Sequence, residues 1–310
     1  MELEVKIKEA ERTLKLAAEM SEYYYHKPLI ICYSGGKDSD VMLDIANKCL
    51  KPNQFEVLNS HTTVDAPETV YHIRAVFKDL EAQGIKTTIK MPMYKGERTS
   101  MWKLIEQKSM PPTRTKRYCC AVLKEASTPN RMVAVGVREA ESKGRQGRGE
   151  FGVLGRRKAD GEYRSLGHTF AMFQMDKYGG EDAYQCEMIK ACKGNKDTIV
   201  NPIYYFTETD VWDYIKAFGI KTNPLYCEGF KRVGCVGCPM AGGRTMLNEF
   251  ARWPQYKTNY IKAFDRMQKN NEAKGIFNKI GIRNGEEWFE WWIGGNPNQL
   301  KIDDLIERTE

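Results

Sequence analysis

The first 140 residues alternate between two spacings of hydrophobic positions. Apolar residues recur at helical spacing over residues 4–25, and a short continuous apolar run follows over residues 28–33. A run of that length is typical of a strand buried on both faces of a parallel sheet. Helical spacing then resumes over residues 41–46. The pattern therefore predicts a helix, a buried strand and a second helix.

Further strands are predicted over residues 55–58, 85–89 and 132–137. A helix between the first two begins at Pro67, because proline is favoured in a first turn, and ends near Gly84. Strands that alternate with helices of this length imply a parallel sheet covered on both faces. We therefore predict an α/β fold, a doubly wound parallel sheet, with its ligands bound beyond the carboxyl ends of the strands.

The alternation breaks down after the fourth predicted strand. Basic side chains lie among glycines there, namely Lys143, Arg145, Arg148, Arg156, Arg157, Lys158 and Arg164. We interpret residues 143–166 as a mobile surface excursion, and the irregular region extends to about residue 195. Further on, Thr207 offers a side-chain cap to a helix over residues 208–218, and Gly219 ends that helix.

The C-terminal region is helical and aromatic in pattern from about residue 246. Trp288, Trp291 and Trp292 lie close together in it, and tryptophans of this kind are more often core or interface residues than a ligand cage. We expect one domain over residues 1–245 and a helical C-terminal extension over residues 246–310.

Composition narrows the class of protein. The chain has 310 residues, of which 41% are hydrophobic and 29% are charged, and its formal net charge is +7. This mild basic bias suits anionic ligands such as nucleotides or nucleic acid, although a solvated basic surface explains it equally well. The N-terminus lacks a signal-peptide core, and the longest apolar run is too short to cross a bilayer. We expect a soluble cytoplasmic protein with no membrane partner.

The residues that follow the first strand are suited to phosphate binding. They are Ser34, Gly35, Gly36, Lys37, Asp38 and Ser39. Two glycines let backbone N–H groups converge at the start of a helix, the lysine adds a point charge, and the serines add donors. The aspartate could hold Mg²⁺ or brace the loop. The spacing differs from that of a Walker loop, and a Gly-Gly turn alone is a common structural device.

The cysteines form a second group. Nine occur in a chain without an export signal, which favours free thiols or metal ligation in a reducing compartment. Cys119 and Cys120 are adjacent, and Cys235 and Cys238 form a Cys-x-x-Cys pair far downstream. Four thiolates can bind zinc or an iron–sulfur cluster, and an adjacent pair is unusual for zinc. Unliganded thiols are the remaining alternative.

Together these motifs resemble the phosphoadenosine phosphosulfate (PAPS) reductase family of the adenine-nucleotide α-hydrolase-like, or PP-loop, enzymes. The loop at residues 34–39 resembles the family's pyrophosphate-binding loop. Residues 65–69, 136–138, 210–212 and 223–226 resemble further family segments in the same order, so the resemblance covers about residues 25–245.

The resemblance implies a set of nucleotide-binding residues. Besides the loop residues 34–39, these are Asp65, Lys124, Gly136, Arg138 and Glu141, with Lys37, Asp38 and Arg138 also assigned to catalysis. The lysine after the cysteine pair would face a phosphate or sulfate, and the alternative is a solvated lysine.

The cysteine pattern resembles that of assimilatory adenylyl-sulfate reductases. The resemblance implies a [4Fe–4S] cluster on Cys119, Cys120, Cys235 and Cys238, next to the nucleotide, with zinc as the alternative. Those reductases also carry a nucleophilic cysteine in a C-terminal Glu-Cys-Gly segment, whereas no cysteine follows Cys238 in this sequence. Cys227 could carry a persulfide instead, or could be a bystander.

The family also includes ATP-dependent enzymes that adenylate an oxygen and replace it by sulfur, as in DNA phosphorothioation. We predict an enzyme of this ATP pyrophosphatase and sulfurtransferase type, using ATP, Mg²⁺ and the cluster. The alternatives are a PAPS or adenylyl-sulfate reductase and a non-catalytic nucleotide- or nucleic-acid-binding subunit. Expected partners are DNA or RNA through the basic segment, and a cysteine desulfurase or thioredoxin. The basic segment could instead be a solvated loop that orders only when nucleotide binds.

Overall fold

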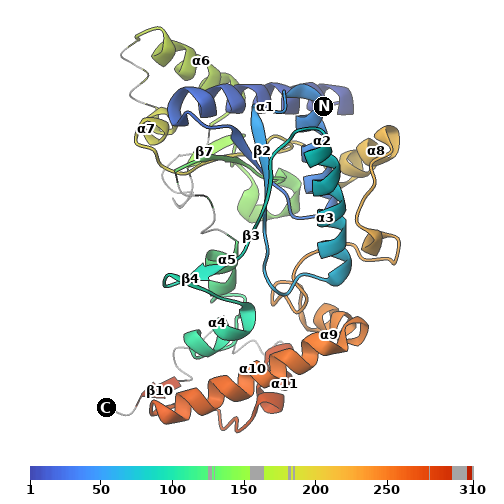
Figure 1. The fold of residues 1–310 in the computed structure, drawn as a ribbon, viewed down its shortest axis with the longest axis vertical. Coiled ribbons are helices and arrows are strands. Elements are labelled where there is room, and N and C mark those ends of the chain that lie inside the picture. Colours follow the sequence, from blue (N-terminus) through green and yellow to red (C-terminus); the bar gives the residue numbers. More distant parts are fainter. Residues whose placement is uncertain are drawn as a thin grey trace. The chain divides into compact units, whose positions relative to one another are not determined.

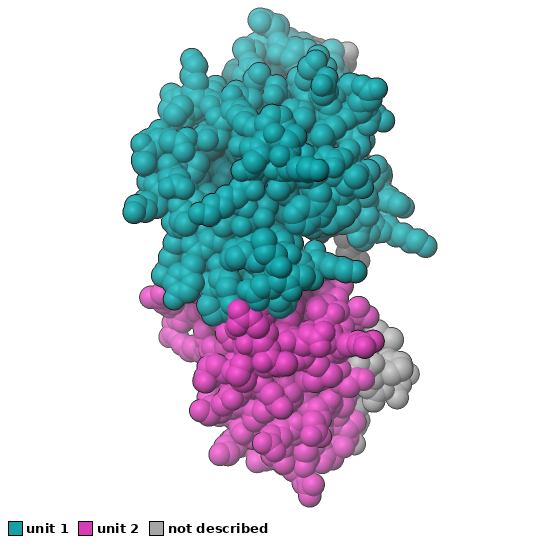
Figure 2. Space-filling view, turned by 90° about the vertical axis from the view of Figure 1, so that its right-hand side faces the viewer, with its two compact units in different colours: residues 1–60, 67–90, 128–233 teal, residues 61–66, 91–127, 234–310 magenta. Residues whose placement is uncertain are grey.

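The computed structural model describes residues 1–124, 128, 130–153, 164–180, 183, 186–278, 280–294 and 306–308. The chain forms two compact units that interleave along the sequence (Figure 2). Unit 1 contains residues 1–60, 67–90 and 128–233, and unit 2 contains residues 61–66, 91–127 and 234–310.

A mostly parallel sheet forms the centre of unit 1. Its strands are β1 (Leu29–Cys32), β2 (Phe55–Ser60), β3 (Thr87–Lys90), β6 (Met132–Ala134), β8 (Thr198–Val200) and β7 (Phe151–Val153). They lie in the order β3-β2-β1-β6-β8-β7, and all neighbours are parallel except the antiparallel pair β7 and β8. Because strands on opposite sides of β1 are joined through helices, the predicted α/β class is confirmed.

Helices flank this sheet (Figure 1). They are α1 (Leu3–Tyr25), α2 (Lys37–Cys49), α3 (Pro67–Ala82), α6 (Leu166–Lys177), α7 (Glu187–Lys193) and α8 (Glu208–Phe218). Helix α1 packs against β1, β6 and β8 through its apolar stripe. Leu14 of that helix and Leu29 and Ile31 of β1 are fully buried, and each such side chain contributes about 2 kcal/mol of hydrophobic stabilisation.

The predicted boundaries are confirmed where capping chemistry is present. Thr207 accepts a hydrogen bond from the N–H of Asp210 at the start of α8, and Gly219 ends the helix with a positive φ of 63°. The sequence pattern does not specify where a ladder ends. Strand β2 accordingly runs two residues beyond its predicted end, β3 begins two residues later than predicted, and β6 ends three residues earlier.

The interpretation of residues 143–166 as a mobile surface excursion is wrong in part. Phe151 and Val153 are buried in β7, which pairs with β8 at the edge of the sheet. The strand has only three residues, of which the central one is Gly152, so it has too few apolar residues for periodicity to reveal it. Arg156, Arg157 and Lys158 lie outside the described residues.

Unit 2 is mainly helical. Its helices are α4 (Met101–Lys108), α5 (Tyr118–Leu123), α9 (Gly243–Arg252), α10 (Pro254–Ala273) and α11 (Gly285–Ile293), with small strand pairs β4 (Met93–Tyr94) with β5 (Glu97–Arg98) and β9 (Ile276–Asn278) with β10 (Ile306–Arg308). The helical C-terminal region is therefore confirmed. Trp288 and Trp292 are buried in its core, as expected. Within the described part of the chain, no helix has the length and apolarity needed to cross a bilayer.

Candidate active site

The loop after β1 turns tightly, and two features of its backbone require the observed residues. Gly35 has a φ of +72°, and a Cβ there would lie 2.8 Å from Cγ1 of Ile73, so only glycine fits. Asn223 is fully buried and fixes the loop in place. Its Nδ2 donates to the carbonyl of Gly35 at 3.1 Å and to Oγ1 of Thr69 at 3.0 Å. The loop is thus fixed to α3 and to the segment before Tyr226.

Ser39 closes the turn. Its hydroxyl donates to the carbonyl of Gly36 at 2.7 Å and accepts the N–H groups of Gly36 at 3.2 Å and Ser34 at 3.3 Å. Helix α2 starts at Lys37, directly after this turn. The positive end of the helix dipole therefore lies at the loop, where it favours a phosphate.

Tyr226 contacts the loop from η6 (Pro224–Tyr226), a short 3₁₀ helix. Its hydroxyl accepts the backbone N–H of Lys37 at 3.0 Å, a donor that a phosphate oxygen would also use. Burial raises the pKa of Tyr226 to about 12, so the hydroxyl keeps its proton. The sequence indicated this tyrosine only as part of a family segment and did not reveal the contact.

Two buried cations meet beside the loop. The side chains of Lys37 and Arg138 are only 7% and 4% exposed. Arg138 donates from Nε to Oδ1 of Asp38 at 2.6 Å, and its terminal nitrogen donates to Oε2 of Glu208 at 2.7 Å. Nζ of Lys37 lies 3.3 Å from Oε1 of Glu208 and 3.5 Å from Oδ2 of Asp38. The result is a square of two cations and two carboxylates, in which Asp38 braces the loop.

The segment that follows β6 positions Arg138. A Cβ on Gly136 would lie 3.2 Å from the carbonyl carbon and oxygen of Asp38, so glycine lets this segment approach the start of α2. Oε2 of Glu141 accepts the N–H of Arg138 at 3.2 Å and also pairs with Arg145. Glu141 therefore supports the arginine through its backbone.

A buried polar cluster lies under the loop and was not predicted from the sequence. Tyr33 donates to Oδ1 of Asp40 at 2.6 Å, and Nε2 of His72 lies 2.9 Å from the tyrosine oxygen. All three side chains are buried. Because the aspartate lies in the first turn of α2, this cluster fixes the helix that carries Lys37.

In unit 2, the four predicted cysteine ligands lie in two short segments. Cys119 and Cys120 are on α5, and Cys235 and Cys238 flank a tight turn. Gly237 in that turn has a φ of +72°, and a Cβ there would lie 2.6 Å from Cζ of Phe250. The aromatic core of unit 2 thus fixes the shape of the Cys-x-x-Cys turn.

The four thiols interact with one another. A hydrogen bond with Cys120, together with burial, raises the pKa of Cys119 well above its usual range, and the charges of Cys235 and Cys238 act in the same direction. Among the described residues no three His, Cys, Asp or Glu side chains are arranged to hold a metal ion as they stand. The donor chemistry fits a four-thiolate group, and the side chains would have to close around it.

Asp65 and Lys124 lie with these thiols in unit 2. The carboxylate of Asp65 accepts the N–H of Thr62 at 2.8 Å and lies 3.2 Å from Nδ1 of His61, while its backbone bridges to Cys235. Lys124 is exposed, and the nearby charges of Cys235 and Asp65 raise its pKa. The structure thus places both residues beside the cysteines, and neither is in unit 1 with the loop at residues 34–39.

Cys227 is exposed and directly follows Tyr226. Cys227 is therefore the sequence neighbour of the tyrosine whose hydroxyl contacts the loop at residues 34–39. Cys32, Cys49, Cys186 and Cys192 are the other described cysteines, and burial raises the pKa of Cys32 to about 12.

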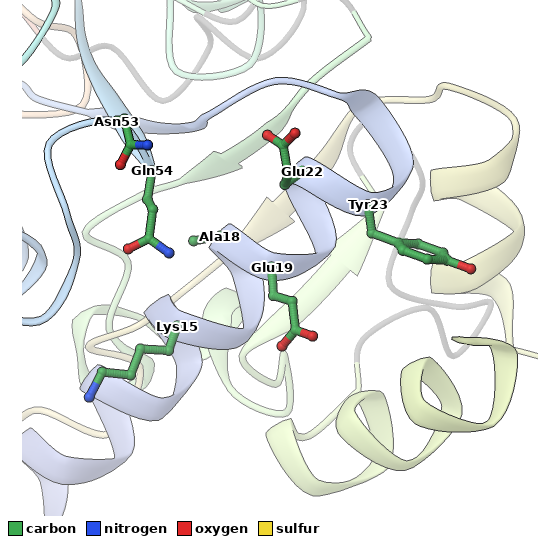
Figure 3. Close-up of a pocket in the computed structure, with 7 residues that line it drawn as sticks. All are labelled: Lys15, Ala18, Glu19, Glu22, Tyr23, Asn53 and Gln54. Carbon is green, nitrogen blue, oxygen red and sulfur yellow. The ribbon is translucent and has the colours of Figure 1, made fainter. Parts of the chain in front are cut away.

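A surface hollow of about 630 Å³ lies elsewhere on unit 1 (Figure 3), and it is lined by Lys15, Ala18, Glu19, Glu22, Tyr23, Asn53 and Gln54. Gln54 immediately precedes β2, so the hollow lies at the amino end of that strand, whereas the loop follows the carboxyl end of β1. Two glutamates in its lining disfavour phosphate. The hollow is not a candidate nucleotide site.

The comparison with protein families decides the classification. Residues 28–241, more than half of the chain, match the family model of the phosphoadenosine phosphosulfate reductase domain. The chain belongs to the phosphoadenosine phosphosulfate reductase domain family. The named members of this PAPS reductase family are enzymes.

Individual relatives of this PAPS reductase-family chain match over limited lengths. An uncharacterised protein of Methanocaldococcus jannaschii is 23% identical over 239 residues, which are 76% of this chain and 47% of that protein. An adenosine 5′-phosphosulfate reductase of Burkholderia cepacia is 46% identical over 41 residues, which are 13% of this chain and 16% of the reductase. The chain thus spans less than half the length of these curated relatives.

Solved structures with a similar chain path include a PAPS reductase from Candida auris, with a phosphate bound. It is 16% identical, with a TM-score of 0.41 over 74% of this chain and 93% of that one. The U34-tRNA thiolase NcsA of Methanococcus maripaludis, with its [4Fe–4S] cluster, is 15% identical and has a TM-score of 0.42. The match covers 87% of this chain and 80% of the thiolase chain. Both similarities are weak.

Proposed function

We propose that this PAPS reductase-family chain is a PP-loop ATP pyrophosphatase and sulfurtransferase that adenylates an acceptor oxygen and exchanges it for sulfur. The observation that carries the proposal is the pair of buried cations, Lys37 and Arg138, at the start of α2. Two fixed positive charges beside a glycine turn can stabilise the charge that develops on a pyrophosphate leaving group. ATP binds with its phosphates on the loop.

The proposed chemistry has two steps. The acceptor oxygen attacks the α-phosphorus of ATP, the bond to the pyrophosphate breaks, and an adenylated acceptor forms. A sulfur nucleophile then attacks the activated centre, and AMP leaves with the former acceptor oxygen. Hydrosulfide needs no reductant in this step, whereas a persulfide donor needs two electrons from a thiol to break its S–S bond.

Residues of this chain have distinct roles in the proposal. Lys37 and Arg138 bind the phosphates, and the serine hydroxyls of the loop orient them. The carboxylate of Asp38 is already engaged by both cations, so its main role is to brace them, and Mg²⁺ would arrive with the nucleotide. Cys227, next to Tyr226, is the proposed sulfur carrier in unit 1.

The four thiols of unit 2 are the proposed ligands of a [4Fe–4S] cluster. Cys119, Cys120, Cys235 and Cys238 would hold it, and zinc is the alternative for the same donors. A bound cluster would hold or deliver sulfur. The aromatic packing around Gly237 supports a turn that is built to present two of these thiols.

A nucleic-acid acceptor is supported by the basic residues after Glu141. Burial lowers the pKa of Arg145, and the charges of Arg148 and Arg232 lower it further, so several guanidinium groups lie near one another in unit 1. Such a cluster favours an anionic ligand such as a phosphate backbone. DNA and RNA are both proposed acceptors, with a cysteine desulfurase as the sulfur source.

A second candidate function is favoured by the family match. The chain shares short segments with adenosine 5′-phosphosulfate reductases. A reductase would bind adenylyl sulfate or PAPS at the same loop and would release sulfite with thioredoxin as the reductant. Cys227 or a thiol of another protein would then attack the sulfur.

Parallel turnover assays separate the two functions. Anaerobically purified protein is incubated with magnesium ATP and nucleic acid, and separately with adenylyl sulfate or PAPS and thioredoxin. Pyrophosphate is expected in the first reaction, and Lys37→Ala should abolish its formation. Lys51→Ala, which changes an exposed lysine just beyond α2, should retain the activity. Sulfite in the second reaction with no pyrophosphate in the first would establish the reductase instead.

A further inference from the structure

Glu208 is the most exposed member of the charged square in unit 1. Its side chain is 57% exposed, compared with 7% for Lys37, 4% for Arg138 and 21% for Asp38. It is the first residue of α8 and follows the capping residue Thr207. The cap is complete without Glu208, because Thr207 and Asp210 bond to each other's backbone.

The carboxylate of Glu208 contacts the same two cations that the proposed function assigns to substrate phosphates. Each carboxylate oxygen contacts one cation: Oε1 lies 3.3 Å from Nζ of Lys37, and Oε2 lies 2.7 Å from the guanidinium of Arg138. Burial would raise the pKa of Glu208, but both cations outweigh that effect and lower it. The carboxylate is therefore an anion at the position where a phosphate would bind.

The two acids of the square differ in how easily they can leave it. Asp38 has a short side chain on α2 and lies mostly buried against Arg138. Glu208 has a longer side chain, lies on another helix and is in contact with solvent. Because its side chain reaches solvent, water hydrates this carboxylate once it leaves the cations, so an incoming anion can displace it at a modest cost.

We propose that Glu208 is a positioning residue that holds Lys37 and Arg138 in the empty site and is displaced by the phosphates of the substrate. The inference rests on the proposed function in one respect, that phosphates bind at this loop. It predicts that removing the charge of Glu208 strengthens phosphate binding, because the ligand no longer has to replace an internal anion.

Trp212 supplies a built-in reporter for this displacement. Its Nε1 donates to Oε1 of Glu208 at 3.3 Å, one helical turn along α8, and its ring contacts Tyr226 edge-on at 5.3 Å between centroids. The indole is 37% exposed. When Glu208 leaves the cations, this hydrogen bond changes, so the fluorescence of Trp212 should change on binding and the change should be absent in Trp212→Phe.

Calorimetric titration with inorganic pyrophosphate tests the proposal on the full chain. Glu208→Gln is expected to bind about tenfold more tightly than the wild type, and Glu208→Asp, which is one carbon shorter, to bind with an intermediate affinity. Asp213→Asn removes the same charge from an exposed position on the same helix and is the matched control. It should leave the affinity unchanged. A purely structural role predicts weaker binding, never tighter.

The outcomes separate this inference from the proposed function. In one outcome the wild type binds pyrophosphate, Lys37→Ala does not bind it, and Glu208→Gln binds it no more tightly than the wild type. The inference about Glu208 is then wrong, while phosphate binding at the loop is supported. If the wild type and Lys37→Ala both fail to bind pyrophosphate or ATP, the proposed function and the inference are both wrong. Circular dichroism of Glu208→Asp and Glu208→Gln checks that a loss does not reflect unfolding.

Discussion

Arg138 and Asp38 are a hundred positions apart in the sequence and are joined by a 2.6 Å hydrogen bond from the guanidinium Nε to the carboxylate. The contact links the start of α2 to the segment after β6, two neighbouring parts of the sheet's carboxyl edge. The arginine is nearly completely buried. One interaction thus orders both a phosphate-binding loop and a cation beside it.

The Arg138–Asp38 pair is predicted to stabilise the fold as well as the site. Arg138→Met leaves the carboxylate of Asp38 without its main partner, and removing one partner of a buried pair costs about 3–5 kcal/mol. Since Asp38 is partly exposed, we expect Arg138→Met to lower the free energy of unfolding by about 2–3 kcal/mol. Urea denaturation of Arg138→Met, Asp38→Asn and the double variant should give a coupling free energy of at least about 1 kcal/mol. Additive effects would contradict the pairing.

Gly136 is predicted to be required for the shape of the phosphate loop. Gly136→Ala places a Cβ 3.2 Å from the carbonyl group of Asp38, and a strain of about 1–3 kcal/mol is expected. The affinity for ATP should fall by at least about tenfold, because the loop must move. Gly167→Ala is the control, since a Cβ there meets nothing within 4 Å. Equal ATP affinity in both variants would show that the close approach is unimportant.

The four cysteines of unit 2 are predicted to bind metal as a set. Cys238→Ser should remove most of the iron from anaerobically purified protein, and Gly237→Ala should do the same without deleting a ligand, because its Cβ would clash with Phe250 at 2.6 Å. Cys49→Ser, a cysteine outside the set, should retain the iron. Iron and zinc analysis of each variant measures this. Zinc in place of iron would support the alternative metal, and neither metal in the wild type would refute the site.

Glu150 should make the stability depend on pH. Burial raises its pKa above the ordinary value of 4.5, and Tyr205 donates a hydrogen bond to it at 3.3 Å. As pH rises from 4.5 to the raised value, the unfolded chain loses this proton before the folded protein does. The free energy of unfolding therefore falls in this window.

Glu150→Gln removes that dependence. The difference in unfolding free energy between the wild type and this variant should shift in favour of the variant as pH increases from about 4.5 to 7. Below the window the difference should be constant. Urea titrations at several pH values measure it, and a difference that does not change with pH would show that the carboxyl group titrates normally.

Much of the fold could be predicted because local signals were strong. A continuous apolar run identifies β1, and the caps at Thr207 and Gly219 mark the first and last residues of α8. The short strand β7 could not be predicted. Three residues with a central glycine carry no periodicity, and the strand forms only because β8 offers it a partner.

The candidate site was predictable where one segment carries its chemistry. The loop from Ser34 to Ser39 is contiguous, so its residue types alone indicate phosphate binding. The contacts of Glu208, Tyr226 and Asn223 with that loop span more than 160 positions and depend on how the sheet is assembled. Sequence periodicity contains no information about such distant pairs, so only the structure shows them.

The products of ATP cleavage show whether this chain adenylates an acceptor. Anaerobically purified protein is incubated with magnesium ATP labelled at the α- or the γ-phosphate, together with nucleic acid and hydrosulfide, and the products are separated. AMP and pyrophosphate are expected in equal amounts; Lys37→Ala should abolish both products, and Lys51→Ala should retain them. Formation of ADP and phosphate, or intact ATP with sulfite released from adenylyl sulfate or PAPS in a parallel reaction, would contradict it.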